Sequence, residues 1–271
     1  METNAGFSKS VTQEMTNSLF EINLGETFAH MPNAPIVEAV IHWQARPEQI
    51  PEPEKLLAEL EEKLPGYPNP QRQHEFGVET HIGPDGPTIQ QHQTWHGFRF
   101  ESEDKYHVAQ FTRNGFVFSR LKPYESWSPF QTEAMRLWAI YCELMSPPEI
   151  SRLGVRFINQ IAPASVAGLK DWLTMPPCCP ENMPMPLKQF MHQNLFGVPN
   201  HPYNLNVIQA IQPPDGTSES EHHSLILDFD VFTTHPLKIE DVTDRLQEMR
   251  WIKNKAFFTF LKSDAQRHFM E

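Results

Sequence analysis

The fold class of this 271-residue chain is decided by residues 98–121, FRFESEDKYHVAQFTRNGFVFSRL. Two runs rich in aromatic and β-branched residues, 94–100 and 106–112, are separated by the polar tetrapeptide SEDK, which suits a hairpin loop. Asn-Gly at 114–115 is the strongest short signal for a tight hairpin turn, and it joins the second run to 116–121. The stretch therefore predicts consecutive antiparallel strands.

Further strands and helices are predicted on both sides of this stretch. Apolar, β-rich runs predict strands at 36–43, 150–161, 203–212 and 224–232. Apolar residues that recur every three or four positions predict helices at 54–64, 128–145, 166–173, 187–196 and 239–261. We therefore predict an α+β fold, in which an antiparallel sheet has helices packed on one face. The repeated order suggests two similar strand–helix–strands–helix halves.

The chain divides into three parts on this interpretation. Residues 1–33 are polar and lack clear periodicity, which is typical of a flexible N-terminal arm. The first α+β half is expected at 34–149 and the second at 150–271, with one core shared between them.

Charge and composition exclude several classes of protein. The chain has 22 basic and 34 acidic residues, a net charge of -12, which argues against a general nucleic-acid-binding surface. No window approaches 18 uninterrupted apolar residues, and the N-terminal 20 residues do not have the pattern of a secretory signal. Three cysteines, two of them adjacent, do not form a disulfide framework. These features predict a cytoplasmic protein with no membrane span.

A polar surface is expected on one face of the sheet. Alternate residues of a strand face opposite sides, and four predicted strands each have one apolar face and one partly polar face. The polar faces contribute Glu38, His42, Arg156, Gln160, Asn204, Asn206, Asp228 and Asp230. Three interpretations stay open, namely a solvated face, ion pairs of Arg156 with Glu38 or Asp228, and a binding or catalytic site.

Motifs that would establish catalysis or metal binding are absent from the sequence. Asp228, Asp230 and Glu38 could supply oxygen ligands to a divalent cation, but an Asp-x-Asp pattern is common in acidic chains. Zinc is disfavoured because the candidate ligands do not form matched pairs; they are His81, His92, His96, Cys178 and Cys179. No nucleophile elbow, phosphate-binding loop or dinucleotide fingerprint is present. We predict no metal and no cofactor.

An aromatic cluster marks the junction between a predicted strand and a predicted helix. Tyr124, Trp127 and Phe130 lie in the segment KPYESWSPF. Such residues fix the direction in which the chain enters a helix, or stack on a ligand.

Four segments in this order and spacing resemble a sporadically distributed prokaryotic family of uncharacterised soluble proteins of about this length. They are APIVEAVIHW at 34–43, the run 98–130, ISRLGVRFINQI at 150–161, and LILDFDVF with the final helix at 225–261. The resemblance is most specific in PIVEAV and in the Arg and Asn of RFIN, and it marks Glu38, Tyr124, Trp127, Arg156 and Asn159. Asn159 thereby joins the predicted binding residues. The resemblance implies an accessory or defence-type gene neighbourhood and no catalytic mechanism.

Three functions are compatible with these features. The first is a non-enzymatic binding module for a protein partner or small ligand, which the lack of a catalytic motif favours. The second is a metal-dependent hydrolase or phosphoryl-transfer enzyme that uses Asp228, Asp230 and Glu38. The third is a homo-oligomer, such as a homodimer, that assembles through the C-terminal helix. Four of its apolar residues lie outside or at the margin of its main apolar stripe, namely Trp251, Phe257, Phe258 and Leu261.

Overall fold

The structure is a computed structural model that describes residues 20–83, 86–161, 168–178, 180, 182–185, 187–212 and 224–271. Its strands are β1 (Ile36–Gln44), β2 (Gln71–Gly83), β3 (Gly86–Glu101), β4 (His107–Thr112), β5 (Gly115–Leu121), β6 (Arg152–Ile161), β7 (Met191–Gly197), β8 (Asn204–Gln212) and β9 (Ser224–Thr233). All nine belong to one antiparallel sheet with the order β2-β3-β4-β5-β1-β6-β9-β8-β7.

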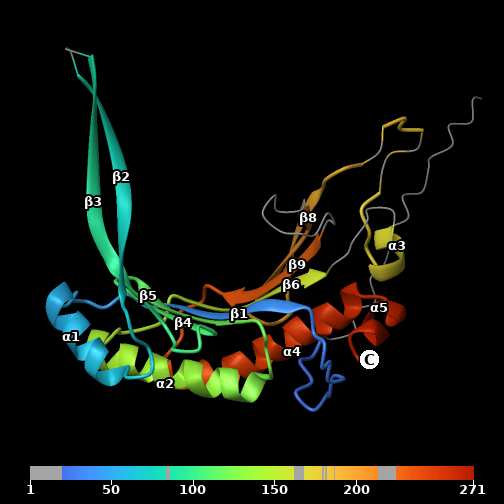
Figure 1. Cartoon of the computed structure of the whole chain (residues 1–271), viewed down its shortest axis with the longest axis horizontal. Helices are drawn as coiled ribbons and strands as arrows, with labels where there is room; N and C mark the ends of the chain where they lie inside the picture. The colour runs from blue at the N-terminus through green and yellow to red at the C-terminus, as the bar shows by residue number, and fades with distance from the viewer. Residues whose placement is uncertain are drawn as a thin grey trace, which may run out of the picture.

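The helices are α1 (Pro53–Lys63), α2 (Trp127–Met145), α3 (Leu169–Trp172), α4 (Val242–Phe260) and α5 (Ser263–His268). A 3₁₀ turn, Ile239–Asp241, leads into α4. Helices α1, α2 and α4 lie along one face of the sheet, while the β2–β3 hairpin and the β7–β8 side rise away from the other face (Figure 1). The predicted α+β class, an antiparallel sheet with helices on one face, is confirmed. No helix in the described part of the chain has the length and apolar character needed to cross a bilayer.

Two halves of the chain share this single sheet. The first half runs β1, α1, β2–β5, α2, and the second runs β6, α3, β7–β9, α4. In each half the last strand pairs with the first, so that β5 lies beside β1 and β9 lies beside β6. Because β1 also pairs with β6 at the centre of the sheet, the halves are joined by backbone hydrogen bonds and have a common core.

The hairpin between β4 and β5 lies where Asn-Gly predicts one, but Gly115 is the first residue of β5 and not part of the turn. Thr112 pairs with Gly115, so the turn consists of Arg113 and Asn114. Gly115 has φ of +153°, and a Cβ atom there would lie 2.0 Å from the carbonyl oxygen of Trp43. Only glycine fits here, because neighbouring β1 passes too close for any side chain.

Three sequence-based boundaries were wrong or only partly correct. The helix predicted at 187–196 is not formed. Met191–Gly197 are instead the edge strand β7, because their backbone pairs with β8, and a short apolar pattern of this kind fits either a helix or a strand. The helix predicted at 166–173 covers only Leu169–Trp172 in the described residues. The final helix ends at Phe260, after which the short helix α5 follows. The sequence also predicts a turn at 83–86, GPDG, and a polar loop at 213–223. Residues 84–85 and 213–223 lie outside the described part of the chain.

Aromatic side chains fill the core between the sheet and α2. Trp43 of β1 stacks on Trp138 with ring centroids 5.2 Å apart, and Trp138 stacks on Tyr141. The Tyr141 hydroxyl is buried and donates to the carbonyl oxygens of Ala45 at 2.7 Å and Thr112 at 3.3 Å. This hydroxyl thereby ties α2 to the ends of two strands.

We expect Tyr141→Phe to lower the free energy of unfolding by about 1–2 kcal/mol, because it removes the donor and leaves buried carbonyl oxygens without it. Urea denaturation at pH 7 measures the change. Tyr106→Phe is the matched control, since that ring is 39% exposed and its hydroxyl has no hydrogen bond among the described residues. Equal effects of the two substitutions would contradict the assigned role of the Tyr141 hydroxyl.

Candidate functional site

The predicted polar residues lie on the sheet face that α1, α2 and α4 leave uncovered. One row across β1, β6, β9 and β8 consists of Val40, Arg156, Asp230 and Asn206, and the next consists of Glu38, Ile158, Asp228 and Ile208. His42 and Asn204 belong to a third row, and Gln160 lies at the far end of β6. The pairing register therefore puts Glu38, His42, Arg156, Gln160, Asn204, Asn206, Asp228 and Asp230 on one side.

Two arginine–aspartate pairs dominate this open face. Arg156 donates to Asp228 from Nε at 2.9 and 3.0 Å and from Nη2 at 2.6 Å. Arg152 donates from Nη2 to Asp230 at 2.9 Å, and its Nη1 lies 3.1 Å from Nδ1 of His42. The charges of both aspartates are therefore matched within the protein. The Arg156–Asp228 pair is one of those that the sequence left open, whereas the Arg152–Asp230 pair was not predicted.

The electrostatics of the open face fit a structural network. Burial and the Arg152 charge lower the pKa of His42 to about 4, so the neutral ring accepts a hydrogen bond at pH 7. Burial raises the pKa of Asp230, and Arg152 and Arg156 oppose that rise. Arg152 was missed from the sequence, although it has the same strand parity as Arg156 and could have been identified from it.

The three carboxylates of the proposed metal site do not converge. Glu38 and Asp228 share a row but lie two strands apart, which corresponds to about 10 Å at ordinary strand spacing. Asp228 and Asp230 are each bound by an arginine. Within the described residues no group of three histidine, cysteine or acidic side chains could hold a metal ion. The geometry does not support the metal-dependent alternative. Cys179 and the side chain of His81 lie outside the described part.

Asn159 does not belong to the open face, and its inclusion there was wrong. It occupies an odd position of β6 and points to the helix side, where it is 1% exposed. Its Nδ2 donates to the carbonyl oxygens of Leu227 at 3.0 Å and Phe157 at 3.3 Å. Its Oδ1 is buried and has no hydrogen-bond partner in the described structure. Alternation along β6 dictates this placement.

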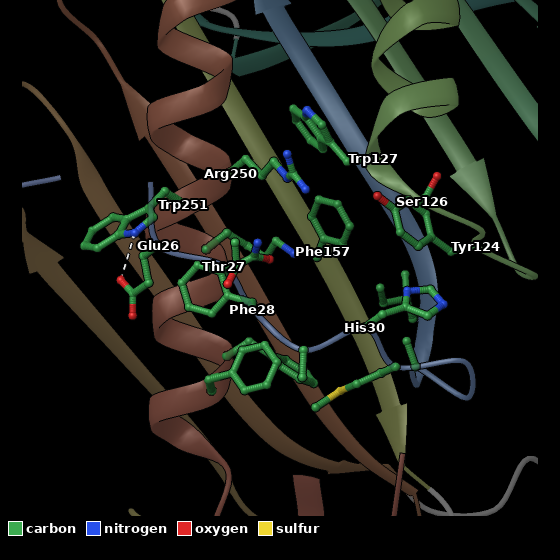
Figure 2. Close-up of a pocket in the computed structure, with 18 of the residues that line it drawn as sticks. Glu26, Thr27, Phe28, His30, Tyr124, Ser126, Trp127, Phe157, Arg250 and Trp251 are labelled. Carbon is green, nitrogen blue, oxygen red and sulfur yellow. Dashed lines mark hydrogen bonds between the residues drawn. The ribbon is translucent and has the colours of Figure 1, made fainter. Parts of the chain in front are cut away.

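A cavity of about 530 Å³ lies beside Asn159 on the helix side (Figure 2). It is bounded by residues 24–36, the entry into α2, the strand β6 and the helix α4. Its walls include the aromatic rings of Phe28, Tyr124, Trp127 and Phe157. Trp127 Nε1 is buried and, like Asn159 Oδ1, has no partner among the described atoms. The cavity thus combines apolar walls with one unused donor and one unused acceptor.

Three of the five positions marked by the family resemblance line this cavity, namely Tyr124, Trp127 and Asn159. Phe130, the third member of the aromatic junction, lies in the core and stacks on Phe118. The junction therefore both fixes the entry into α2 and forms a wall of the cavity.

Two cationic side chains of α4 enter the cavity lining. The guanidinium of Arg250 lies 5.7 Å from the ring centroid of Trp127, and Nζ of Lys253 lies 3.9 Å from that of Phe157. Figure 2 shows Arg250 directed toward the space between Trp127 and Phe157. No described carboxylate forms an ion pair with either cation. Burial and the Arg250 charge lower the pKa of Lys253 to about 7.

Both acidic residues in the lining are engaged elsewhere. Glu26 accepts from Trp251 Nε1 at 3.0 Å and from Lys255 Nζ at 2.7 Å. Glu125 accepts from Arg120 at 3.2 Å. The cavity therefore has an excess of positive charge inside a chain whose net charge is -12.

The segment that closes the cavity also covers the second apolar face of α4. Phe20 packs edge-on against Trp251, and Phe28 stacks on Phe258 with centroids 5.4 Å apart. Trp251, Phe257 and Leu261 are buried within the chain. Residues 20–33, expected as part of a flexible arm, are held here by these contacts; residues 1–19 lie outside the described structure. The apolar face that suggested a homo-oligomer is covered largely by the chain itself.

Comparison with protein-family models gives no match, and comparison with curated proteins gives none either. Function is therefore argued from the chemistry of the cavity and of the open face.

We expect the two members of the Arg156–Asp228 pair to contribute unequally to stability. Asp228 is 6% exposed and Arg156 is 46% exposed. Arg156→Met leaves a buried carboxylate without its partner and should lower the free energy of unfolding by about 3 kcal/mol. Asp228→Asn leaves an arginine that can reach water, and should cost about 1 kcal/mol. Urea denaturation at pH 7 compares them, and a larger loss for Asp228→Asn would contradict this asymmetry.

Lys253 should destabilise the protein at neutral pH. Its pKa is about 7 in the folded chain but about 10.4 when unfolded. Between these values the unfolded state binds more protons, so wild-type stability rises as pH rises from 7 to 10. We expect Lys253→Met to stabilise the protein by roughly 2–4 kcal/mol at pH 6, with the gain fading toward pH 10. Denaturation at several pH values tests this, with Lys63→Met as the control.

Proposed function

We propose that this protein is a non-enzymatic binding module whose ligand is a small anion with a flat apolar portion. The observation that carries the proposal is that Arg250 and Lys253 share one cavity while both acids of its lining are bound elsewhere. Arg250 is exposed and Lys253 is half-buried at the wall of this cavity, so a negative ligand that enters it would meet both positive charges.

The lining supplies a role for each part of such a ligand. A guanidinium binds carboxylate or phosphate oxygens through paired N–H donors, which suits Arg250. The rings of Tyr124, Trp127 and Phe157 offer apolar faces for a flat group. Trp127 Nε1 would donate to an acceptor on the ligand, and Asn159 Oδ1 would accept from a donor. The volume of about 530 Å³ lies within the range of small-molecule sites.

The unfavourable charge of Lys253 fits this function. A cation that is kept in an apolar setting without an acidic partner destabilises the folded chain, and proteins tolerate such groups mainly at functional sites. A bound anionic ligand would pair with this cation and so stabilise the folded chain. Because a bound anion raises the pKa of Lys253, binding should take up a proton near pH 8 and weaken as the pH rises further.

Isothermal titration with phenyl phosphate and phenylacetate tests the proposal. We expect binding to the wild-type chain, at least tenfold weaker affinity for Arg250→Met and Lys253→Met, and unchanged affinity for the matched control Lys63→Met. Lys63 is the last residue of α1, and its Nζ forms an ion pair with Glu143 of α2 at 2.8 Å. Equal affinity of Lys253→Met and wild type, or no binding of either probe up to millimolar concentration, would overturn the proposal.

A cytoplasmic location, prokaryotic origin, an accessory or defence-type gene context and self-assembly stay predictions from the sequence. A protein partner at the open face is the weaker form of the binding hypothesis, because the aspartates there are already matched by arginines.

A further inference from the structure

Lys253 has a different environment from the lysines whose polar partners the structure shows. Four of those lie near a carboxylate at the surface, namely Lys55, Lys63, Lys238 and Lys255, and Lys262 donates to the carbonyl oxygen of Lys170. The Lys253 ammonium instead lies against the ring of Phe157, inside the cavity, with no hydrogen-bond acceptor among the described residues. An amine in this position lies at the wall of the cavity and forms no ion pair with a described carboxylate.

Arg250 lies three residues earlier on the same helix, so the two side chains are neighbours on one face of α4. A ligand whose anionic group binds Arg250 would bring its adjacent atoms to Nζ of Lys253. 2-Oxo acids place a keto carbon, with which a primary amine can condense, directly next to a carboxylate.

We propose that the amine of Lys253 condenses with the keto group of an aromatic 2-oxo acid, held by Arg250, to form a Schiff base. This inference rests on the proposed function, since it assigns a substrate class to the same cavity. It goes beyond simple binding, because a covalent and reversible bond forms.

The condensation needs no further reactant. The lone pair of the neutral amine adds to the carbonyl carbon, and a proton passes from nitrogen to the carbonyl oxygen through water, which gives a carbinolamine. The hydroxyl then takes up a proton from solvent and leaves as water while the nitrogen lone pair forms the C=N bond. The resulting iminium gives its N–H proton back to solvent. Amine and ketone thus become imine and one water, with no change in oxidation state.

The surroundings of Lys253 favour the neutral amine that this reaction requires. Only an unprotonated lysine is nucleophilic, and an apolar setting beside a second cation is a known way to obtain one. Desolvation and the Arg250 charge lower the pKa of Lys253 to about 7. The other titratable groups of the lining are Glu26, Glu125, His30 and Tyr124. Neither Glu26 nor Glu125 pairs with Lys253 and raises its pKa, because each carboxylate is bound to another side chain.

Reductive trapping of the full chain tests the inference. Phenylpyruvate is the probe, sodium cyanoborohydride reduces any imine to a stable amine, and peptide mass mapping locates the adduct. We expect one adduct per chain at Lys253 and none with Lys253→Met. Labelling should fall at least tenfold with Arg250→Met and stay unchanged with Lys63→Met. The rate should reach half its maximum near pH 7, as opposed to pH 10 for an ordinary lysine.

Lys253→Arg separates the covalent step from binding, because it keeps the positive charge and removes the nucleophilic amine. This variant should bind phenylacetate, which has no keto group, but should not be trapped with phenylpyruvate. If phenylacetate binds the wild type through Lys253 and no adduct forms with phenylpyruvate, the Schiff base is wrong while the binding function stands. If phenylacetate does not bind either, the binding function itself fails. Adducts spread over exposed lysines at comparable rates would also overturn the inference.

Discussion

The antiparallel pairing of β1 with β6 is the interaction on which the rest of the structure depends. These two strands come from different halves of the chain and lie at the centre of the sheet, with β5 on one side and β9 on the other. Their register fixes which face each residue of the neighbouring strands occupies, since side chains alternate along every strand. One register therefore decides both that the aromatic residues meet α2 and α4 and that the arginine–aspartate pairs lie on the open face.

The two faces of the sheet differ in how their charged side chains are paired. On the open face Arg152 and Arg156 are each matched by an aspartate, so the network is complete within the chain. On the helix side Arg250 and Lys253 have no such match, although Glu26 and Glu125 are close by. The difference arises because both carboxylates already have donors. Trp251 and Lys255 donate to Glu26, and Arg120 donates to Glu125. The half-buried ammonium of Lys253, which lies against Phe157 and forms no ion pair with a described carboxylate, is the stronger indication of a ligand.

The cavity exists because segments that are distant in the sequence cover the same helix. Residues 20–33 cross α4 through ring contacts such as Phe28 with Phe258 and through the bonds of Glu26. The entry into α2 supplies Tyr124 and Trp127 on the opposite side. Each wall also has a structural role, so the cavity is held open by the same packing that stabilises the fold.

The sequence by itself determined the fold class, most of the strands, the long helices and the polar alternation in β1, β6, β8 and β9. These features depend on local periods of two or about 3.6 residues and on turn residues such as Asn-Gly, which are visible in a single chain. The sequence could not establish that residues 191–197 form a strand, because this depends on their pairing with β8. Nor could it establish that Arg156 pairs with Asp228, because these residues meet only when β6 and β9 pair in the sheet. The candidate site was only partly predictable. Tyr124, Trp127 and Asn159 were singled out, but nothing in the sequence distinguished Arg250 and Lys253 from the other cations of the final helix. Only tertiary structure decided that these two face a cavity, since the segment that encloses them begins more than 200 positions earlier in the chain.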